Sequence, residues 1–368
     1  MSGQIRQIPL AKPVFDEEME AAALNALRNE RFVLGESVCK FEEEFARYVG
    51  TKYAVSTSSG TNALQIALLA LGVRVEVVTS AFSFVASANA VLHAGATPVF
   101  ADIDAGTFNV DPGRMRQRVT KHTGALLPVH LYGYPCAMDE IRDLAEERGL
   151  RVVEDACQAH GAEYVGRRAG AIGDVGCFSF YPSKNMTVCG DGGMITTNNE
   201  DVAKLAAKLR DCGRKSQYEH DVVGYTSRLN TVNAAVGLVQ LQRLDEWNKR
   251  RLEVAGWYDK LLGNVEGVVC PPRGSGEVKP VYHLYVVRAK RRAELREHLK
   301  AKGVATGVHY PLPIPLQPIY QQMCHFKSGD YPVSEQASRD CLSLPMSPFL
   351  SEEDVGYVCG NIREFYDV

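Results

Sequence analysis

Several sequence features that identify large classes of protein are missing from this chain. No two of its ten cysteines are three positions apart, so the Cys-x-x-Cys spacing of zinc sites and of thioredoxin-type redox sites is absent. The cysteines are scattered between Cys39 and Cys359. We therefore expect no metal site, and we expect free, packed thiols in a reducing cytoplasm.

Long apolar runs and an excess of charge of one sign are also missing. The densest apolar stretch, Ala63–Val73, is interrupted by Gln65 and is too short to span a bilayer. The start of the chain shows no apolar segment of the kind that directs secretion. The 41 Lys and Arg residues nearly balance the 44 Asp and Glu residues, which gives a net charge of −3. These features favour a cytoplasmic protein that binds neither membranes nor nucleic acids.

The common signatures of nucleotide-binding and hydrolytic sites are absent as well. The chain has no G-x-G-x-x-G after a predicted strand, no G-x-x-x-x-G-K-[S/T], no H-E-x-x-H and no G-x-S-x-G. These absences argue against a dinucleotide-dependent dehydrogenase, a P-loop NTPase, a zinc protease of that type and a serine hydrolase of the nucleophile-elbow type.

What the chain does contain is an alternation of β-rich runs and amphipathic helices over its first three quarters. Its 368 residues suggest two or three domains, and the alternation is typical of helices packed on a mostly parallel sheet. A long helical pattern runs from about Asn233 to Leu262, and short strands mixed with helices follow it. We therefore predict an α/β protein. Its large domain covers 1–260, including the N-terminal segment and the bridging helix, and a smaller α+β domain covers 261–368.

Two local predictions concern segments outside the main alternation. Apolar residues at helical spacing predict a helix over Ser37–Tyr48, with Ser37 in position to cap it. The run Val304–Tyr310 is predicted as a strand of the smaller domain.

Three segments at predicted strand ends carry residues from which a site could be built. In Ser58–Leu64 a strand runs into a helix, and Gly60 would let the helix N-terminus approach an anion, although an ordinary capped turn has the same pattern. In Val152–His160 a buried strand ends in two adjacent acids, where parallel sheets bind ligands; a capping Asp beside a solvated Glu is the alternative. In Gly176–Asn185 an aromatic-rich strand leads to Lys184, which is either a surface charge or a partly desolvated nucleophile.

Together, these segments offer what pyridoxal phosphate needs, namely a phosphate cradle, an acid at a strand end, a hydroxyl and a lysine. The lysine forms the Schiff base, and the acid keeps the pyridine nitrogen protonated so that the ring can withdraw electrons from the substrate carbon. Residue types of this kind are common, so their spacing alone does not decide between the alternatives.

Motifs in a fixed order along nearly the whole chain narrow the choice. They are Ile8–Pro13, Phe41–Glu42, Ser59–Leu64, Phe82–Ala86, Val129–Gly133, Glu154–Gly161, Phe178–Phe180 with Lys184, Gly224–Arg228, Val308–Pro311 and Leu344–Met346. This set resembles the DegT/DnrJ-type family of pyridoxal-phosphate-dependent sugar aminotransferases. The resemblance implies the type I aminotransferase fold, with a mostly parallel sheet of the seven-stranded type flanked by helices.

The resemblance implies a role for each matching residue around the cofactor ring. Lys184 is implied to form the internal aldimine and to carry the proton between the two substrate carbons. Asp155 is implied to pair with the pyridine nitrogen. Gln158 is implied to lie beside the ring hydroxyl, and Phe84 to stack on the ring.

The resemblance also implies a phosphate cradle and a second subunit. The backbone of Gly60 and Thr61 and the hydroxyl of Ser179 are implied to hold the phosphate. In this family the Gly224–Arg228 loop reaches into the neighbouring subunit's site, which implies an obligate homodimer with two shared sites. Thr226 stands where that loop usually has Asn. Because a hydroxyl donates one hydrogen bond, we expect a weakened or rebuilt phosphate contact from the neighbouring subunit.

Two further departures and one match bear on the chemistry. The Leu71–Val77 segment lacks the usual Gly-Pro-Gly-Asp turn and is shortened, and Pro315 stands where a His is common near the substrate. Some relatives that remove a hydroxyl carry His in place of the lysine, so Lys184 favours amino transfer.

We expect the amino group to pass from glutamate to a keto group of a nucleotide-linked sugar, in a route to surface polysaccharides or natural-product glycosides. The alternatives are a pyridoxal-phosphate enzyme acting on another keto substrate, such as an inosose, and a non-catalytic regulatory or sensory homologue. The His309–Pro311 segment favours amination at C-3 over C-4. Four candidate substrate contacts each have a structural alternative, such as a cap, a strand end or a salt bridge; they are His160, Arg228, His309 and Tyr310.

Overall fold

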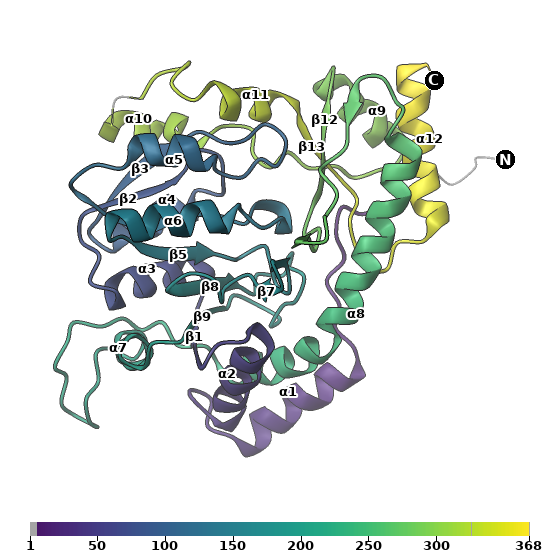
Figure 1. Cartoon of the computed structure of the whole chain (residues 1–368). Helices are drawn as coiled ribbons and strands as arrows, with labels where there is room; N and C mark the ends of the chain where they lie inside the picture. Colours follow the sequence, from purple (N-terminus) through teal and green to yellow (C-terminus); the bar gives the residue numbers. More distant parts are fainter. Residues whose placement is uncertain (1–5, 325, 368) are drawn as a thin grey trace.

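A seven-stranded sheet in the order β1-β9-β8-β5-β4-β2-β3 forms the centre of the protein (Figure 1). The structure is a computed structural model that describes residues 6–324 and 326–367. The strands are β1 (Tyr53–Thr57), β2 (Glu76–Ser80), β3 (Thr97–Ala101), β4 (Thr123–Leu127), β5 (Arg151–Asp155), β8 (Val175–Ser179) and β9 (Gly193–Thr197). β9 is antiparallel to both of its neighbours, whereas β8, β5, β4, β2 and β3 are mutually parallel. The predicted mostly parallel α/β sheet is confirmed.

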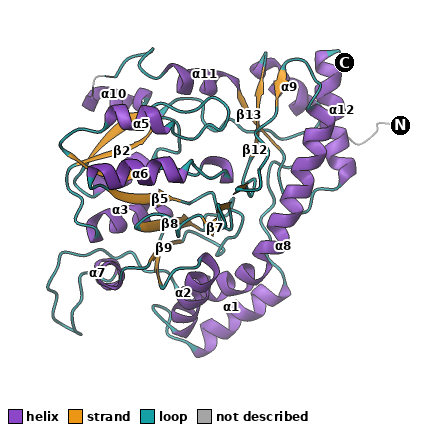
Figure 2. Ribbon diagram, in the orientation of Figure 1, coloured by secondary structure: helices purple, strands orange, loops and turns teal. Residues whose placement is uncertain are grey.

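Helices cover both faces of this sheet, which explains why its strands are apolar on both sides (Figure 2). Val153 of β5 belongs to the core that α3 (Gly60–Ala70), α4 (Ala86–His93) and α7 (Glu200–Arg210) form on one face. Its neighbour Val152 points to the other face, where α5 (Pro112–Arg118) and α6 (Met138–Arg148) pack. None of the described helices combines the length and the apolar composition that crossing a bilayer requires.

The helix α8 (Thr231–Leu262) connects this assembly to a second, antiparallel sheet (Figure 1). Its first half packs on α1 (Glu17–Asn29) and α2 (Glu36–Val49). Its last turns contribute Val254, Tyr258 and Leu262 to the core of the second sheet. That sheet consists of β10 (Val268–Val269), β12 (Tyr285–Ala289) and β13 (Cys341–Leu344), and α9 (Arg292–Ala301) and α12 (Glu352–Tyr366) pack on it.

Parts of the chain beyond residue 261 also pack on the large sheet. The ring of Phe100 in β3 lies 5.6 Å from that of Tyr320 in α10 (Pro318–Cys324), and Asp102 accepts a 2.9 Å hydrogen bond from the backbone N–H of Ser334 in α11 (Pro332–Asp340). A small sheet pairs β11 (Val278–Lys279) with β6 (Glu163–Tyr164), which in turn pairs with β7 (Arg167–Arg168). The division into 1–260 and 261–368 therefore remains a prediction, with packing across it.

Both local predictions are wrong in detail. Gly35 caps α2, and Ser37 lies inside the first turn, where its hydroxyl donates to Glu30 at 2.6 Å because that carboxylate lies within reach. The segment Val304–Tyr310 makes isolated bridges to two different partners, so it does not form one continuous strand.

Candidate active site

The carboxyl ends of several parallel strands open into one cavity of about 470 Å³. This is the edge at which open α/β sheets bind ligands. The predicted site residues that line the cavity are Gly60, Thr61, Phe84, Asp155, Gln158, Ser179, Lys184, His309 and Tyr310.

Asp155 ends β5, and its carboxylate is fixed from two sides. The hydroxyl of Ser87 donates to Oδ2 at 2.7 Å, and the backbone N–H of Cys157 donates to Oδ1 at 3.2 Å. Ser87 lies in the first turn of α4, and its hydroxyl is also 3.0 Å from that of Ser83. Although Asp155 is only 5% exposed, it lines the cavity, so it can accept a hydrogen bond from a protonated ring nitrogen.

Gln158 is held between a backbone group and a tyrosine. Its Oε1 accepts from the backbone N–H of Tyr132 at 2.8 Å, and its Nε2 donates to the Tyr310 hydroxyl at 3.2 Å. The ring centroid of Tyr310 is 6.0 Å from that of Phe84. Phe84 is 54% exposed and lines the cavity, so a flat ligand ring could cover an aromatic face that the protein leaves open.

Lys184 follows β8 after a turn in which its backbone N–H donates to the carbonyl of Tyr181 at 2.8 Å. Its side chain is half-buried in the cavity wall. Burial lowers the pKa of Lys184, and the neighbouring Cys157 and Asp155 oppose that change. A lowered pKa enlarges the fraction of free amine near neutral pH, which is the form that acts as nucleophile and base.

The N-terminus of α3 lies at this same edge of the sheet, directly after the carboxyl end of β1, and offers a place for an anion. Ser59 caps the helix, and the backbone N–H groups of Gly60 and Thr61 have no acceptor within it. A Cβ on Gly60 would lie 2.7 Å from Cβ of Ser179 and 2.8 Å from Sγ of Cys157. Glycine is therefore required at position 60, because only glycine lets the positive end of the helix lie against β8. The free N–H groups at this helix end are suited to bind a phosphate.

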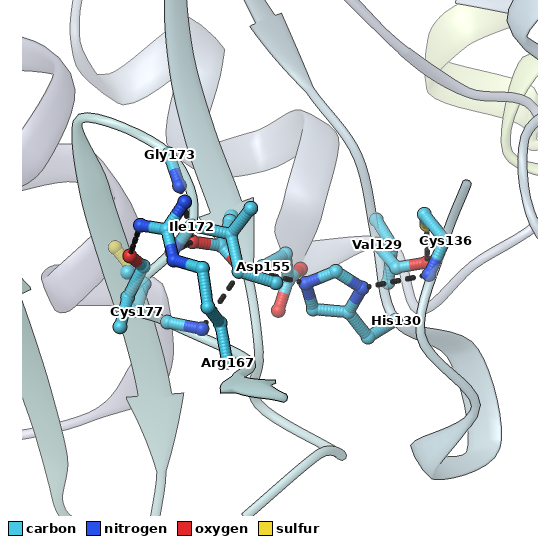
Figure 3. A network of polar contacts seen from close by, with 12 residues as sticks. Val129, His130, Cys136, Asp155, Arg167, Ile172, Gly173 and Cys177 are labelled. Atoms are coloured by element: carbon cyan, nitrogen blue, oxygen red, sulfur yellow. Dashed lines mark hydrogen bonds and ion pairs between the residues drawn. The ribbon is translucent and has the colours of Figure 1, made fainter. Parts of the chain in front are cut away.

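The acid next to Asp155 belongs to a buried network on the other side of β5 (Figure 3). Three backbone N–H groups donate to the carboxylate of Glu154, those of Gly170, Ile172 and Gly173. Nε2 of His130 lies 3.0 Å from the same carboxylate, and Nδ1 accepts from the backbone N–H of Cys136. The backbone N–H of His130 in turn donates to the carbonyl of Asp155 at 3.1 Å. The alternative of a solvated Glu is therefore wrong, and this network holds the end of β5.

Two histidines close the cavity on the side of the second sheet. Nδ1 of His309 lies 2.8 Å from the hydroxyl of Ser343 in β13, and burial lowers the pKa of His309, with the charge of Lys184 adding to the effect. His283 is buried, its Nδ1 has no partner within residues 6–324 and 326–367, and burial lowers its pKa well below the usual value. Both rings are therefore neutral near pH 7.

Three predicted residues lie outside this cavity. His160 is fully buried between Phe178 and Phe180, at ring distances of 5.3 and 5.8 Å, and neither ring nitrogen has a hydrogen-bond partner among the described residues. Thr226 is exposed, and the Arg228 guanidinium pairs with Asp211 at 2.5 Å. The predicted placement of the last two residues in a neighbouring subunit's site remains a prediction. Among the described residues, no group of three potential ligands is placed to hold a metal ion.

Sequence reasoning missed Ser87 and His283. Ser83 and Ser87 are one helical turn apart, directly beside the Phe82–Ala86 motif, so that spacing was a usable signal. His283 lies in an apolar run with no local sign of function.

A lysine and a buried acid share a strand-end cavity with a candidate anion cradle, and this arrangement fits a pyridoxal-phosphate-dependent transaminase of the type I aminotransferase fold. The comparisons agree, because the model described as the DegT/DnrJ/EryC1/StrS aminotransferase family matches residues 13–363. The chain belongs to this family, and its cofactor is pyridoxal phosphate.

Three known proteins illustrate this relationship. A Geobacillus stearothermophilus protein named "Pleiotropic regulatory protein" is 43% identical over 371 residues, which cover 100% of this chain and 97% of the relative. The dTDP-3-amino-3,4,6-trideoxy-alpha-D-glucose transaminase of Streptomyces venezuelae is 42% identical over 95% of this chain and 92% of its own. The crystal structure of S. venezuelae DesV in complex with a ketimine intermediate has a TM-score of 0.94 and 40% identity, and the match covers 98% of this chain and 99% of that one.

Proposed function

We propose that this transaminase moves an amino group from glutamate to a keto carbon of a nucleotide-linked sugar, with C-3 favoured over C-4. The observation that carries the proposal is the position of Lys184 and Asp155 in one large cavity, with the phosphate cradle at its edge. The name of the S. venezuelae relative, which places the nitrogen at C-3 of a dTDP-linked sugar, supports the substrate class.

Each residue of the cavity has a task in this proposal. Pyridoxal phosphate, when bound, withdraws electrons from the substrate carbon. Asp155 holds the protonated ring nitrogen, Gln158 lies beside the ring hydroxyl, and Phe84 covers the ring. The N–H groups at the start of α3 and the Ser179 hydroxyl hold the phosphate. Lys184 anchors the cofactor and then moves a proton at Nζ between the two carbons that exchange the amine, because its lowered pKa suits both directions.

We also propose that the active unit is a homodimer in the cytoplasm. Leu27, Phe32 and Val33 are exposed by 48%, 69% and 41%, and they line one hollow next to the start of α8. A second chain would cover this apolar surface. It would also bring Thr226 and Arg228, which have no place in the cavity of their own chain, to the neighbouring site. The nine cysteines whose side chains the structure describes are all free thiols, which supports a reducing compartment.

A regulatory function is the second candidate, because a relative that matches the whole chain carries a regulatory name. The two candidates differ in turnover, since a regulator need not convert its cofactor to the amine form.

The test is transfer of a nitrogen label. The purified enzyme with cofactor is incubated with ¹⁵N-glutamate and, separately, with dTDP- and UDP-linked 3-keto and 4-keto sugars and with an inosose. We expect ¹⁵N in a 3-amino nucleotide sugar, detected by mass spectrometry. Label that enters the inosose alone would contradict the substrate class. If glutamate leaves the visible absorbance band of the cofactor unchanged, the protein is not a glutamate-dependent transaminase.

A further inference from the structure

A second, smaller recess adjoins the active-site cavity at Lys184. It has a volume of about 20 Å³, which is room for one water-sized group. Ala11, Ser183 and Lys184 line both the recess and the main cavity. A ligand bound near Lys184 could therefore extend a small group into the recess.

The recess is cationic and has no compensating acid. Lys12, Lys184 and Arg251 line it, and no Asp or Glu is among the described residues that line it. Among the described residues, none of these three cations takes part in an ion pair within 4.0 Å. Lys12 and Arg251 keep their positive charge when Lys184 is attached to the cofactor, and two positive side chains around one small space favour an anion there.

Arg251 is the strongest sign that a partner is missing. It is only 5% exposed, and its Nη1 donates to the carbonyl oxygens of Tyr282 and His283 at 3.1 and 3.4 Å. Its Nε has no hydrogen-bond partner in the part of the chain that the structure describes. Burial lowers the pKa of Arg251 to about 10, with no neighbouring acid to offset the effect. A buried guanidinium without an anion is costly, so a ligand that supplies a negative charge would be stabilised.

We propose that this recess binds a small anion, either a carboxylate of the amino donor or a free halide ion. The volume admits one carboxylate oxygen or one halide and excludes a diphosphate. The shared wall at Lys184 places the recess beside the amine that the donor must approach, which favours the donor carboxylate. The proposal rests on the proposed function, because it assigns a subsite for the amino acid that supplies the nitrogen.

The test measures binding of glutarate, which has the carboxylates of glutamate but no amine to react. Enzyme with bound cofactor is titrated by calorimetry in gluconate buffer, with and without chloride. Lys12 is exposed, so Lys12→Gln should fold normally and weaken glutarate binding about two- to fivefold. Arg251→Gln should weaken it about tenfold or more, and Arg251→Lys should recover part of the loss. The matched control is Lys249→Gln, an exposed lysine of the same helix outside the recess, which should change nothing.

The outcomes separate the two sources of the anion. If chloride competes with glutarate and both variants weaken both ligands, the recess holds the donor carboxylate. If the variants weaken chloride binding alone, it is a halide site. If neither ligand depends on Lys12 or Arg251, the proposal is wrong. The nitrogen-label experiment judges the proposed function independently, because wild-type enzyme can transfer label whether or not glutarate binding depends on these residues.

Discussion

Two groups of predicted cofactor contacts lie in very different surroundings. One is the floor of the cavity, formed by Gly60, Asp155, Gln158 and Lys184, and the other is the Cys212–Arg228 segment. On the floor, Asp155 and Gln158 are each 5% exposed and held by hydrogen bonds from the same chain. The segment extends away from the sheet as a long loop after α7, where Tyr218 is 87% exposed and Val223 is 89% exposed (Figure 1). The floor residues all come from one chain and line one cavity, whereas the loop's predicted contact requires a second chain.

The largest expected effect comes from removing the central group of the floor. Lys184→Ala should retain cofactor without a covalent bond to the protein and should show no multiple turnover, because no other amine lines the cavity within the described residues. Borohydride reduction followed by peptide mass spectrometry measures covalent attachment, and the label-transfer assay measures turnover.

The control for this variant is Lys249→Ala, which changes an exposed lysine outside the cavity and should behave as wild type. Continued turnover in Lys184→Ala would refute the assignment of Lys184.

The next effect tests whether the floor depends on Ser87, which lines the cavity and donates a hydrogen bond to Asp155. Ser87→Ala removes the 2.7 Å hydrogen bond to the buried carboxylate. Hydrogen bonds to charged groups contribute about 1.5–3 kcal/mol, so cofactor affinity should fall about tenfold to a hundredfold. Titration of cofactor-free protein with pyridoxal phosphate measures the change.

Ser83→Ala is the matched control, because Ser83 contacts the Ser87 hydroxyl but not Asp155. It should alter cofactor affinity less than about threefold. Equal losses in the two variants would show that the whole turn, and not the bond to Asp155, positions the carboxylate.

A third prediction concerns the layer beneath the floor. Burial lowers the pKa of His160 to about 3, with the charge of Lys184 adding to the effect, so the folded protein keeps this ring neutral while the unfolded chain protonates it near pH 6.5. The unfolded state then binds more protons below pH 6.5, and stability must fall as the pH falls. Between pH 7 and pH 5 His160 should contribute about 2 kcal/mol of this loss.

Thermal unfolding of wild type and His160→Phe at pH 7 and pH 5 checks the prediction. The variant should lose less stability on acidification, because a phenyl ring has no proton to bind. An identical pH dependence in the two proteins would show that His160 does not carry the effect.

The sequence predicted the floor much better than its supports. Asp155, Lys184 and Gly60 could be placed together because parallel strands bring their carboxyl ends to one edge. Arg251 could not be placed, because α8 reaches the site through packing that no local pattern encodes. Ser87 was missed, although its spacing from Ser83 beside the Phe82–Ala86 motif was a usable signal. Ser37 was misplaced because Glu30, seven residues earlier, competes for its hydroxyl. Thr226 was a prediction from resemblance, and one chain cannot test it.

The smallest expected effect comes from a variant that tests whether the loop of one subunit contacts the cofactor site of the other. If the loop reaches the neighbouring subunit's phosphate, Thr226→Asn adds a second hydrogen-bond donor there and should tighten cofactor binding about two- to fivefold. Titration of cofactor-free protein measures the affinity, and sedimentation at the same concentrations shows whether the protein is dimeric.

Ser216→Asn makes the same kind of change at another exposed position of the loop, outside the resembling motif, and should leave the affinity unchanged. Tighter binding that appears only in Thr226→Asn, and only at concentrations where the dimer forms, would place position 226 at the partner's cofactor. An increase that persists in the monomer would mean that the loop acts on its own chain, and the contrast between a self-sufficient floor and a shared loop would fail.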